Sequence, residues 1–147
     1  MPSSLSIAVV VVNWNAGGYL KKCLQSLKNQ TLKPTRVIVV DNASTDDSIN
    51  GLGEEFESFE IIKLEENTGF AFANNLAVQN VDNCDWIAFL NPDAFASPDW
   101  LEKLSKAAED FPECASFGSH MLRYGSDQID GTGDVYHVCG SAWRRDH

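Results

Sequence analysis

The stretch from Trp86 to Asp93, with the sequence WIAFLNPD, decides how this chain is interpreted. Its first five residues form an apolar run of strand length with bulky side chains, which is typical of a buried β-strand. Pro92 cannot donate to a sheet ladder, so we expect the strand to end before it. Asn91 and Asp93 then emerge at the carboxyl end of the strand, where open α/β sheets bind ligands. A carboxylate in that place suits a divalent metal and the phosphates that the metal carries.

Apolar runs and helical stripes alternate along the rest of the chain. We predict strands at 6–12, 36–40, 60–64, 86–90 and 115–121, and helices at 19–29, 46–56, 70–81 and 98–110. Asp46 and Ser97 are the expected N-caps of the second and fourth helices, with Pro98 at the first position of the fourth. The alternation implies parallel β-α-β units and an α/β fold. After Arg123 we expect a polar, glycine-punctuated stretch without a clear helix.

Size and charge narrow the classes of function. A chain of 147 residues indicates one domain. A net charge of −10 argues against a nucleic-acid-binding surface, which would be basic. The longest apolar run, Ile7 to Val12, is far shorter than the ~20 residues of a transmembrane helix and lacks a basic leader. The widely spaced cysteines, without a Cys-x-x-Cys pair, indicate a reducing cytoplasmic setting rather than a disulfide framework or a zinc site.

Four polar segments follow strands or open helices on the same predicted side of the sheet. They are 13–15 (NWN), 41–46 (DNASTD), 67–75 (NTGFAFANN) and 91–93 (NPD). In this order and spacing they resemble the nucleotide-binding half of family 2 glycosyltransferases, and most of all the rhamnosyltransferase-like branch. The resemblance covers roughly residues 7–119 and implies the GT-A fold, a Rossmann-like αβα sandwich with a mostly parallel sheet.

The resemblance implies a role for each residue at a matching position. Asp41 lies where the family's aspartate hydrogen-bonds the nucleotide base. Asn91-Pro92-Asp93 occupies the place of the family's Asp-x-Asp motif, so Asp93 would bind Mg²⁺ or Mn²⁺ bridging the diphosphate. Such a cation stabilises the charge left on the departing nucleoside diphosphate. The residues expected to contact the nucleotide are Asn13, Asn15, Asp41, Gly69, Asn74 and Asn91.

The function implied by the resemblance is transfer of a sugar from a nucleotide-diphospho-sugar donor to an acceptor hydroxyl, by inverting displacement, in cell-surface polysaccharide or glycoconjugate synthesis. The acceptor would be a saccharide or a lipid-linked sugar, and the full enzyme would associate peripherally with a membrane. A carboxylate at Asp41 favours UDP- or dTDP-sugars, because uracil and thymine both offer it a ring N–H.

Two features depart from the family pattern. Asn91 replaces an acidic residue, so the site carries one negative charge fewer. The downstream acidic residue that serves inverting members as general base has no counterpart in this chain, and we expect the base beyond His147. We therefore predict a nucleotide-sugar-binding domain at 1–123 and the incomplete start of an acceptor-binding region at 124–147. The chain alone would be poorly active or inactive.

Two alternatives remain open at this stage. The chain could be a nucleotide-binding module that holds the donor without transfer. A Rossmann dehydrogenase is disfavoured, because no Gly-x-Gly-x-x-Gly follows the first predicted strand. Within the first loop we interpret Trp14 as a packing residue rather than a stacking platform.

Overall fold

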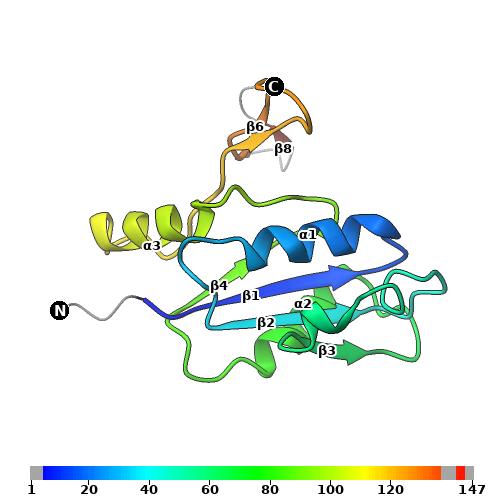
Figure 1. Ribbon diagram of the computed structural model, residues 1–147. Coiled ribbons are helices and arrows are strands. Elements are labelled where there is room, and N and C mark those ends of the chain that lie inside the picture. Colours follow the sequence, from blue (N-terminus) through cyan, green and yellow to red (C-terminus); the bar gives the residue numbers. More distant parts are fainter. Residues whose placement is uncertain (1–4, 137–141, 145–147) are drawn as a thin grey trace. The chain divides into compact units, whose positions relative to one another are not determined.

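The structure is a computed structural model that describes residues 5–136 and 142–144. Its internal contacts divide the chain into two compact units, Met1–Lys106 and Ala107–His147. The first unit holds a sheet of four parallel strands in the order β3-β2-β1-β4 (Figure 1). The strands are β1 (Ile7–Asn13), β2 (Arg36–Asp41), β3 (Glu60–Lys63) and β4 (Trp86–Phe89). The predicted α/β architecture with a parallel sheet is confirmed.

Strand order places a topological switch point beside β1. The chain runs outward from β1 through β2 to β3, then crosses to β4 on the other side of β1. In open α/β sheets, the crevice beyond the carboxyl ends of the two strands at such a reversal is the usual ligand site. The residues after β1 and β4 are therefore the first place to look for function.

The core lies on both faces of this sheet. Each residue of β1 is buried, and alternate side chains pack into two separate apolar clusters. One cluster joins β1 to the buried stripe of α1 (Gly18–Lys28) and to Leu101, in the first turn of α3 (Trp100–Asp110). The other packs under α2 (Phe70–Gln79), whose buried Ala73 and Ala77 let the helix come close to the sheet. Figure 1 shows α1 and α2 on opposite faces of the sheet.

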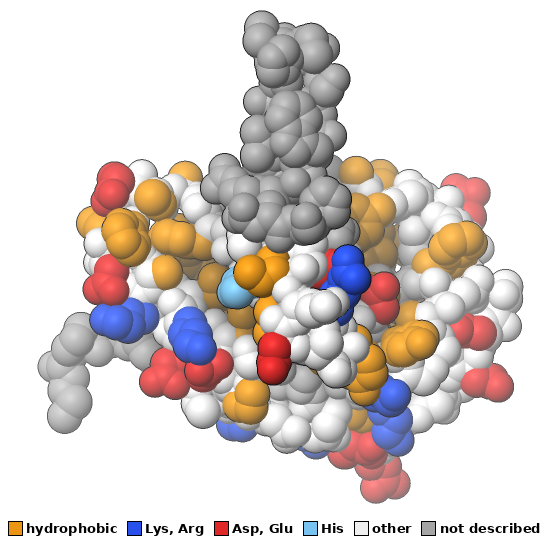
Figure 2. All heavy atoms as spheres, turned by 90° about the horizontal axis from the view of Figure 1, so that it is seen from above, with side chains coloured by type: hydrophobic (Ala, Val, Ile, Leu, Met, Phe, Trp, Pro, Cys, Tyr) orange, Lys and Arg blue, Asp and Glu red, His pale blue; other side chains and the backbone are white. Residues whose placement is uncertain are grey.

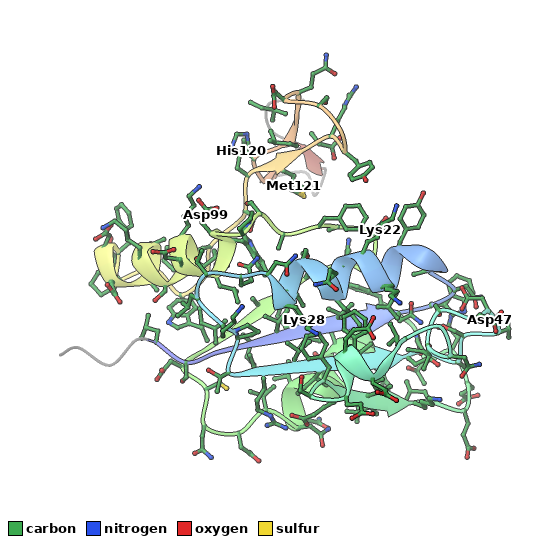
Figure 3. All side chains as sticks on the ribbon, in the orientation of Figure 1. Lys22, Lys28, Asp47, Asp99, His120 and Met121 are labelled. Atoms are coloured by element: carbon green, nitrogen blue, oxygen red, sulfur yellow. The ribbon has the colours of Figure 1, made fainter. Side chains whose placement is uncertain are left out.

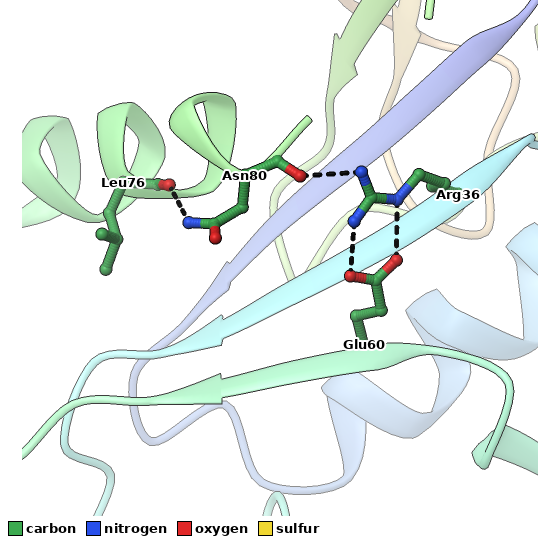
Figure 4. A network of polar contacts seen from close by, with 4 residues as sticks. All are labelled: Arg36, Glu60, Leu76 and Asn80. Atoms are coloured by element: carbon green, nitrogen blue, oxygen red, sulfur yellow. Dashed lines mark hydrogen bonds and ion pairs between the residues drawn. The ribbon is translucent and has the colours of Figure 1, made fainter. Parts of the chain in front are cut away.

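A polar network ties β2, β3 and the end of α2 together at the amino-terminal edge of the sheet (Figure 4). The Arg36 guanidinium donates to both carboxylate oxygens of Glu60, at 2.8 and 2.6 Å, and to the carbonyl of Asn80 at 2.7 Å. The hydrogen bonds from Arg36 lower the pKa of Glu60. This edge is therefore fixed by structural contacts, which leaves the opposite edge for ligands.

Two predicted elements are wrong. The helix expected at 46–56 is a single turn followed by the 3-10 helix η1 (Glu54–Phe56). Asp46 does cap that turn, since its carboxylate accepts a hydrogen bond from Ser48 N at 3.1 Å. The turn ends with a hydrogen bond from Gly51 N to the carbonyl of Asp47. The backbone of Gly53 is extended (φ −89°, ψ 177°), so the helix cannot continue through it.

The strand expected at 115–121 is also wrong. Most of residues 111–122 are exposed, so this stretch has no continuous apolar face to bury against the parallel sheet. In the second unit, β5 (Met121–Leu122) pairs antiparallel with β6 (Ile129–Gly131), and β7 (Asp134–Tyr136) pairs antiparallel with β8 (Ala142–Arg144). The predicted functional boundary at residue 123 stays a prediction.

Candidate nucleotide-sugar site

Four loops gather at the carboxyl edge of the sheet, as the sequence predicts. They surround a cavity of about 1060 Å³. Its lining comes from the loop after β1 and the start of α1, the end of β2, the loop into α2, and the loop after β4: Val12, Trp14, Asn15, Ala16, Gly17, Gly18, Tyr19, Asn42, Asn67, Gly69, Phe70, Asn91, Pro92 and Asp93. In Figure 3, Asp47 marks this edge and Lys28 the opposite end of α1. The cavity lies at the switch point between β1 and β4.

Asn15 joins the loop after β1 to the loop after β2. Its backbone is left-handed (φ 52°), a conformation that Asn tolerates better than most residues. Its Oδ1 accepts hydrogen bonds from Thr45 N at 2.8 Å and Asp46 N at 3.3 Å, and its own N–H donates to Ser44 Oγ at 2.9 Å. Asn15 thus lines the cavity while its side chain fixes the neighbouring loop.

Asp46 also connects the loop after β1 with the loop after β2. Its Oδ2 accepts the N–H of Gly17 at 2.8 Å, and its Oδ1 accepts the hydroxyl of Ser48. The pKa of Asp46 is lowered, above all by the Ser48 hydroxyl and further by backbone N–H groups of Ser48 and Gly17. The carboxylate is therefore ionised at neutral pH, and its hydrogen bonds stabilise the conformation of these two loops.

Asn13 and Asp41 are buried polar residues at the carboxyl ends of β1 and β2. Asn13 is fully buried, and its Nδ2 lies 2.9 Å from Asp41 Oδ1, 2.9 Å from Ser44 Oγ and 2.8 Å from Ser48 Oγ. Its Oδ1 is enclosed without a hydrogen-bond partner among the described residues. Asp41, 7% exposed, does not line the large cavity but a neighbouring one of about 360 Å³. Asn13 is therefore buried against the end of β2 and the loop that follows it, and Asp41 lines the smaller cavity.

Asn42 and Asn67 extend the network to the loop before α2, and the sequence analysis did not single them out. Asn42 Nδ2 donates to Asn67 Oδ1 at 2.9 Å, while Asn42 Oδ1 accepts Thr68 N at 2.9 Å. Asn67 Oδ1 also accepts Gly69 N at 2.9 Å. The sequence feature that could have indicated this contact is a pair of asparagines, one directly after Asp41 and one at the start of the Asn-Thr-Gly turn. Both residues line the cavity.

Two helices begin at the cavity with glycine N-caps. Gly17 precedes α1 and Gly69 precedes α2, with positive φ angles of 55° and 82°. Neither helix has a side-chain hydrogen bond at its cap or an acidic residue in its first turn. The N–H groups of a first turn bind anions readily when no side chain occupies them. The arrangement suits phosphate.

Three exposed aromatic side chains line the cavity: Trp14 is 57% exposed, Tyr19 55% and Phe70 62%. The interpretation of Trp14 as a packing residue is wrong. β1 ends at Asn13, so Trp14 lies beyond the buried strand and its side chain is exposed. Flat apolar rings beside polar amides suit the stacking of a base or a sugar ring.

Asn91 and Asp93 are exposed on the β4 side of the cavity. The loop is held from α1, where Cys23 Sγ donates to the Asn91 carbonyl at 3.5 Å. Burial, together with the negative charge of Asp93, raises the pKa of the Cys23 thiol to about 12. The described lining of the cavity contains one carboxylate, Asp93, and no Lys or Arg.

The side chains of the cavity fit a cation that is bound jointly by the protein and a phosphate-bearing ligand, rather than by protein side chains alone. Within residues 5–136 and 142–144, no three His, Cys, Asp or Glu side chains gather as a metal-binding group. Mg²⁺ is commonly bound by one or two carboxylates together with substrate phosphates. Asp93 could supply the protein carboxylate, and a diphosphate the remaining anionic oxygens.

Asn74 does not line either cavity. It is 9% exposed, and its Nδ2 donates to the carbonyl of Phe70 at 2.9 Å, which steadies the first turn of α2. Of the predicted nucleotide contacts, the structure brings Asn15, Gly69 and Asn91 together with Asp93 around the large cavity. Direct contact by Asn13, Asp41 and Asn74 stays a prediction.

Charges of both signs are mixed on one face of the molecule. On the face shown in Figure 2, Lys and Arg side chains are scattered among Asp and Glu and form no continuous basic area. No helix in the described part of the chain is long and apolar enough to span a bilayer.

Comparison with known proteins identifies the family. The model of the family described as "Glycosyl transferase family 2" matches residues 8–140. Glycosyltransferase GlyA of Streptococcus pneumoniae is 29% identical over 140 residues, which is 93% of this chain and 19% of that protein. The N-acetylglucosaminyl-diphospho-decaprenol L-rhamnosyltransferase of Mycobacterium tuberculosis is 25% identical over 122 residues, 76% of this chain and 40% of that protein.

Solved structures share the fold. Staphylococcus aureus TarS 1-349 in complex with UDP-GlcNAc has a TM-score of 0.65 at 23% identity, covering 92% of this chain and 42% of that chain. Mannosyltransferase PcManGT from Pyrobaculum calidifontis, in complex with GDP-Man and Mn²⁺, has a TM-score of 0.65 at 20% identity, covering 83% and 37%. The chain spans less than half the length of these relatives. With its GT-A-type sheet and a family match over nearly its whole length, this chain belongs to glycosyl transferase family 2.

Proposed function

We propose that the chain is the donor-binding part of a glycosyltransferase that moves a sugar from a UDP- or dTDP-sugar to an acceptor hydroxyl. The observation that carries this proposal is the cavity of about 1060 Å³ at the switch point between β1 and β4. Ligand cavities in proteins commonly measure about 300–1,000 Å³, so the space suits a ligand as large as a nucleotide sugar.

Each part of the donor has a matching surface. The diphosphate would lie at the uncapped helix starts after Gly17 and Gly69, and Asp93 would hold Mg²⁺ or Mn²⁺ with it. When bound, the cation supplies Lewis-acid stabilisation of the departing diphosphate. The base would extend over the end of β2 toward Asp41, which lines the smaller cavity, while the next residue, Asn42, lines the larger one. The aromatic side chains of the lining would bound the sugar and the ribose.

The finer parts of the proposal rest on family membership. Inverting displacement, a saccharide or lipid-linked acceptor, and a role in cell-surface polysaccharide or glycoconjugate synthesis are the expected setting. A cytoplasmic location agrees with the free thiols of Cys23, Cys84 and Cys114.

Calorimetry tests the proposal directly. The chain is titrated with UDP and dTDP in Mn²⁺ and again in EDTA, with NAD as the comparison ligand. We expect binding of a nucleoside diphosphate that weakens when the metal is chelated. Binding of NAD without binding of UDP or dTDP would instead revive a dehydrogenase. Binding without transfer by the full-length protein would favour a nucleotide-binding module.

A further inference from the structure

We propose that Cys23 and Ser26, one turn apart on α1, are positioning residues for Asp93, because they hold the backbone of the loop that carries this carboxylate. The inference rests on the proposed function and deepens it, since it names the residues that would keep the carboxylate where a cation and a diphosphate meet. Neither Cys23 nor Ser26 lines the large cavity, so their effect on a ligand would be indirect.

The loop that carries Asp93 has no regular structure of its own. Residues 90–99, between β4 and α3, form neither a helix nor a strand, so their backbone groups need other partners. The loop begins with a four-residue turn, in which Ala94 N donates to the carbonyl of Asn91 at 3.0 Å. Pro92 and Asp93 are its central residues, and the fixed φ of proline suits the first of these positions. The place of Asp93 therefore depends on how this turn is anchored.

Side chains of α1 anchor the loop on both sides of Asp93. Cys23 Sγ donates to the carbonyl of Asn91 at 3.5 Å, and this is the carbonyl that closes the turn. Ser26 Oγ accepts the N–H of Ala96 at 3.0 Å and donates to the carbonyl of Cys23 at 2.6 Å. Asp93 thus lies between two attachments to the same turn of helix, one before it and one after it.

A further attachment fixes the far end of the loop. Gln30 lies just beyond α1 and is 1% exposed; its Nε2 donates to the carbonyl of Ser97 at 2.7 Å, and its Oε1 accepts Leu101 N at 3.0 Å. Thr31 N donates to the carbonyl of Pro98 at 2.7 Å. Burial of a polar side chain is costly unless it is hydrogen-bonded, and here the partners are backbone groups of the loop and of α3. The loop is therefore held along α1 before α3 begins (Figure 1).

The same helix also contributes directly to the cavity. Gly18 and Tyr19, its first residues, line the cavity, and the Tyr19 ring stacks on Phe95 of the loop with 6.4 Å between the ring centroids. One rigid element therefore sets the spacing between the helix start, where phosphate would lie, and the carboxylate of Asp93. A cation shared by a carboxylate and phosphate oxygens needs a fixed spacing, since Mg²⁺ demands nearly ideal octahedral geometry.

The test measures by calorimetry how much Mn²⁺ strengthens UDP binding, as the ratio of the affinities in Mn²⁺ and in EDTA. We expect Ser26→Ala to lower this ratio about twofold to tenfold, the worth of one neutral hydrogen bond. Ser26→Thr keeps the hydroxyl and should keep the ratio. Cys23→Val removes the donor and Cys23→Ser keeps one, so only Cys23→Val should lower the ratio. Uridine affinity should stay unchanged in these variants, because uridine has no phosphate.

Ile38→Val is the matched control for lost stability, because Ile38 is fully buried in the apolar cluster under α2, on the opposite face of the sheet from α1. Its ratio should equal that of the wild type, and a comparable fall there would overturn the inference. A wild-type ratio in both Ser26→Ala and Cys23→Val would overturn it too. The two positions are tested separately, so one variant that does not fold leaves the other to decide.

Two results in the wild type separate this inference from the proposed function. UDP binding that Mn²⁺ does not strengthen would overturn the positioning role and leave nucleotide binding standing. Failure of both UDP and dTDP to bind in either buffer would overturn the proposed function itself.

Discussion

At the level of single residues, the two carboxylates of the candidate site line different cavities. Asp41 lines the smaller cavity, and Asp93 is exposed and lines the larger one. The two carboxylates are therefore expected to act on different parts of one ligand, and variants can distinguish them.

We predict that Asp93→Asn abolishes the Mn²⁺-dependent part of UDP binding and leaves uridine binding unchanged, because uridine has no phosphate. Asp41→Ala should weaken uridine about tenfold to a hundredfold, the effect of losing one charge-assisted hydrogen bond. Calorimetry with uridine and UDP measures both. Equal loss of uridine affinity in the two variants would show that the roles are not separate.

Cys23 should make stability fall at alkaline pH. Its thiol pKa is raised from 9.0 to about 12, so the folded chain keeps it neutral while the unfolded chain ionises it. The stabilisation is complete below pH 9 and is lost as the pH rises toward 12, by about 1.4 kcal/mol per pH unit.

Urea unfolding between pH 8 and 11 measures this loss, with Cys23→Val as the control that removes the thiol at nearly constant volume. The free energy of unfolding of the wild type should fall more steeply than that of the variant. Parallel curves would contradict the assignment of the loss to Cys23.

At the level of elements, the starts of α1 and α2 depend on backbone geometry. Gly69 has φ 82° and ψ 163°, a region that essentially only glycine occupies. A Cβ on Gly69 would meet nothing within 4 Å, so any effect of a side chain there comes from the backbone rather than from a clash.

We predict that Gly69→Ala lowers the free energy of unfolding by about 1–3 kcal/mol and weakens UDP more than uridine, since the helix start would no longer present its N–H groups. Gly18→Ala is the matched control: its Cβ also meets open space and its φ is not positive. Thermal unfolding and calorimetry measure the two effects. A control that loses as much stability as Gly69→Ala would exclude the backbone explanation.

The elements themselves follow closely from the sequence. Runs such as Ile7–Val12 and stripes such as Leu20, Cys23, Leu24 and Leu27 specify buried strands and helices, and their observed ends differ from the predicted ends by a few residues at most. The helix predicted at 46–56 failed because Gly51 and Gly53 outweigh the cap at Asp46. The site was predictable in its loops. The exposure of Trp14 and the links made by Asn42 were not, because both depend on how loops distant in sequence meet.

At the level of the whole molecule, the described residues form the candidate donor cavity at the carboxyl edge of the sheet. We predict that this chain binds the donor but does not form glycoside efficiently. Positioning of an acceptor can supply roughly 7–11 kcal/mol of the barrier, and a general base typically adds 10²–10⁴-fold. Asp127, Asp130 and Asp134 are the acidic candidates for such a base within this chain, and Asp130 Oδ1 lies 3.7 Å from Arg123 Nε.

To measure glycoside formation, the chain is incubated with UDP- or dTDP-sugars, Mn²⁺ and a panel of acceptors. The released nucleotide and the glycoside are then quantified. We expect slow release of nucleotide and little glycoside. Sustained glycoside formation that disappears in Asp127→Asn or Asp130→Asn would show that the base lies within the chain.

The central place of β1 has a consequence for how the chain acquires its site. β1 pairs with β2 about 30 residues away, but its other edge pairs with β4 in the register Ile7 to Trp86, across nearly 80 residues. During synthesis at about 5–20 residues per second, that edge waits roughly 4–16 s for its partner. Until then a valine-rich edge is exposed to pairing with other chains. The strand that completes the switch point also covers this edge of β1, so the candidate site and the central position of β1 form in the same late step of folding.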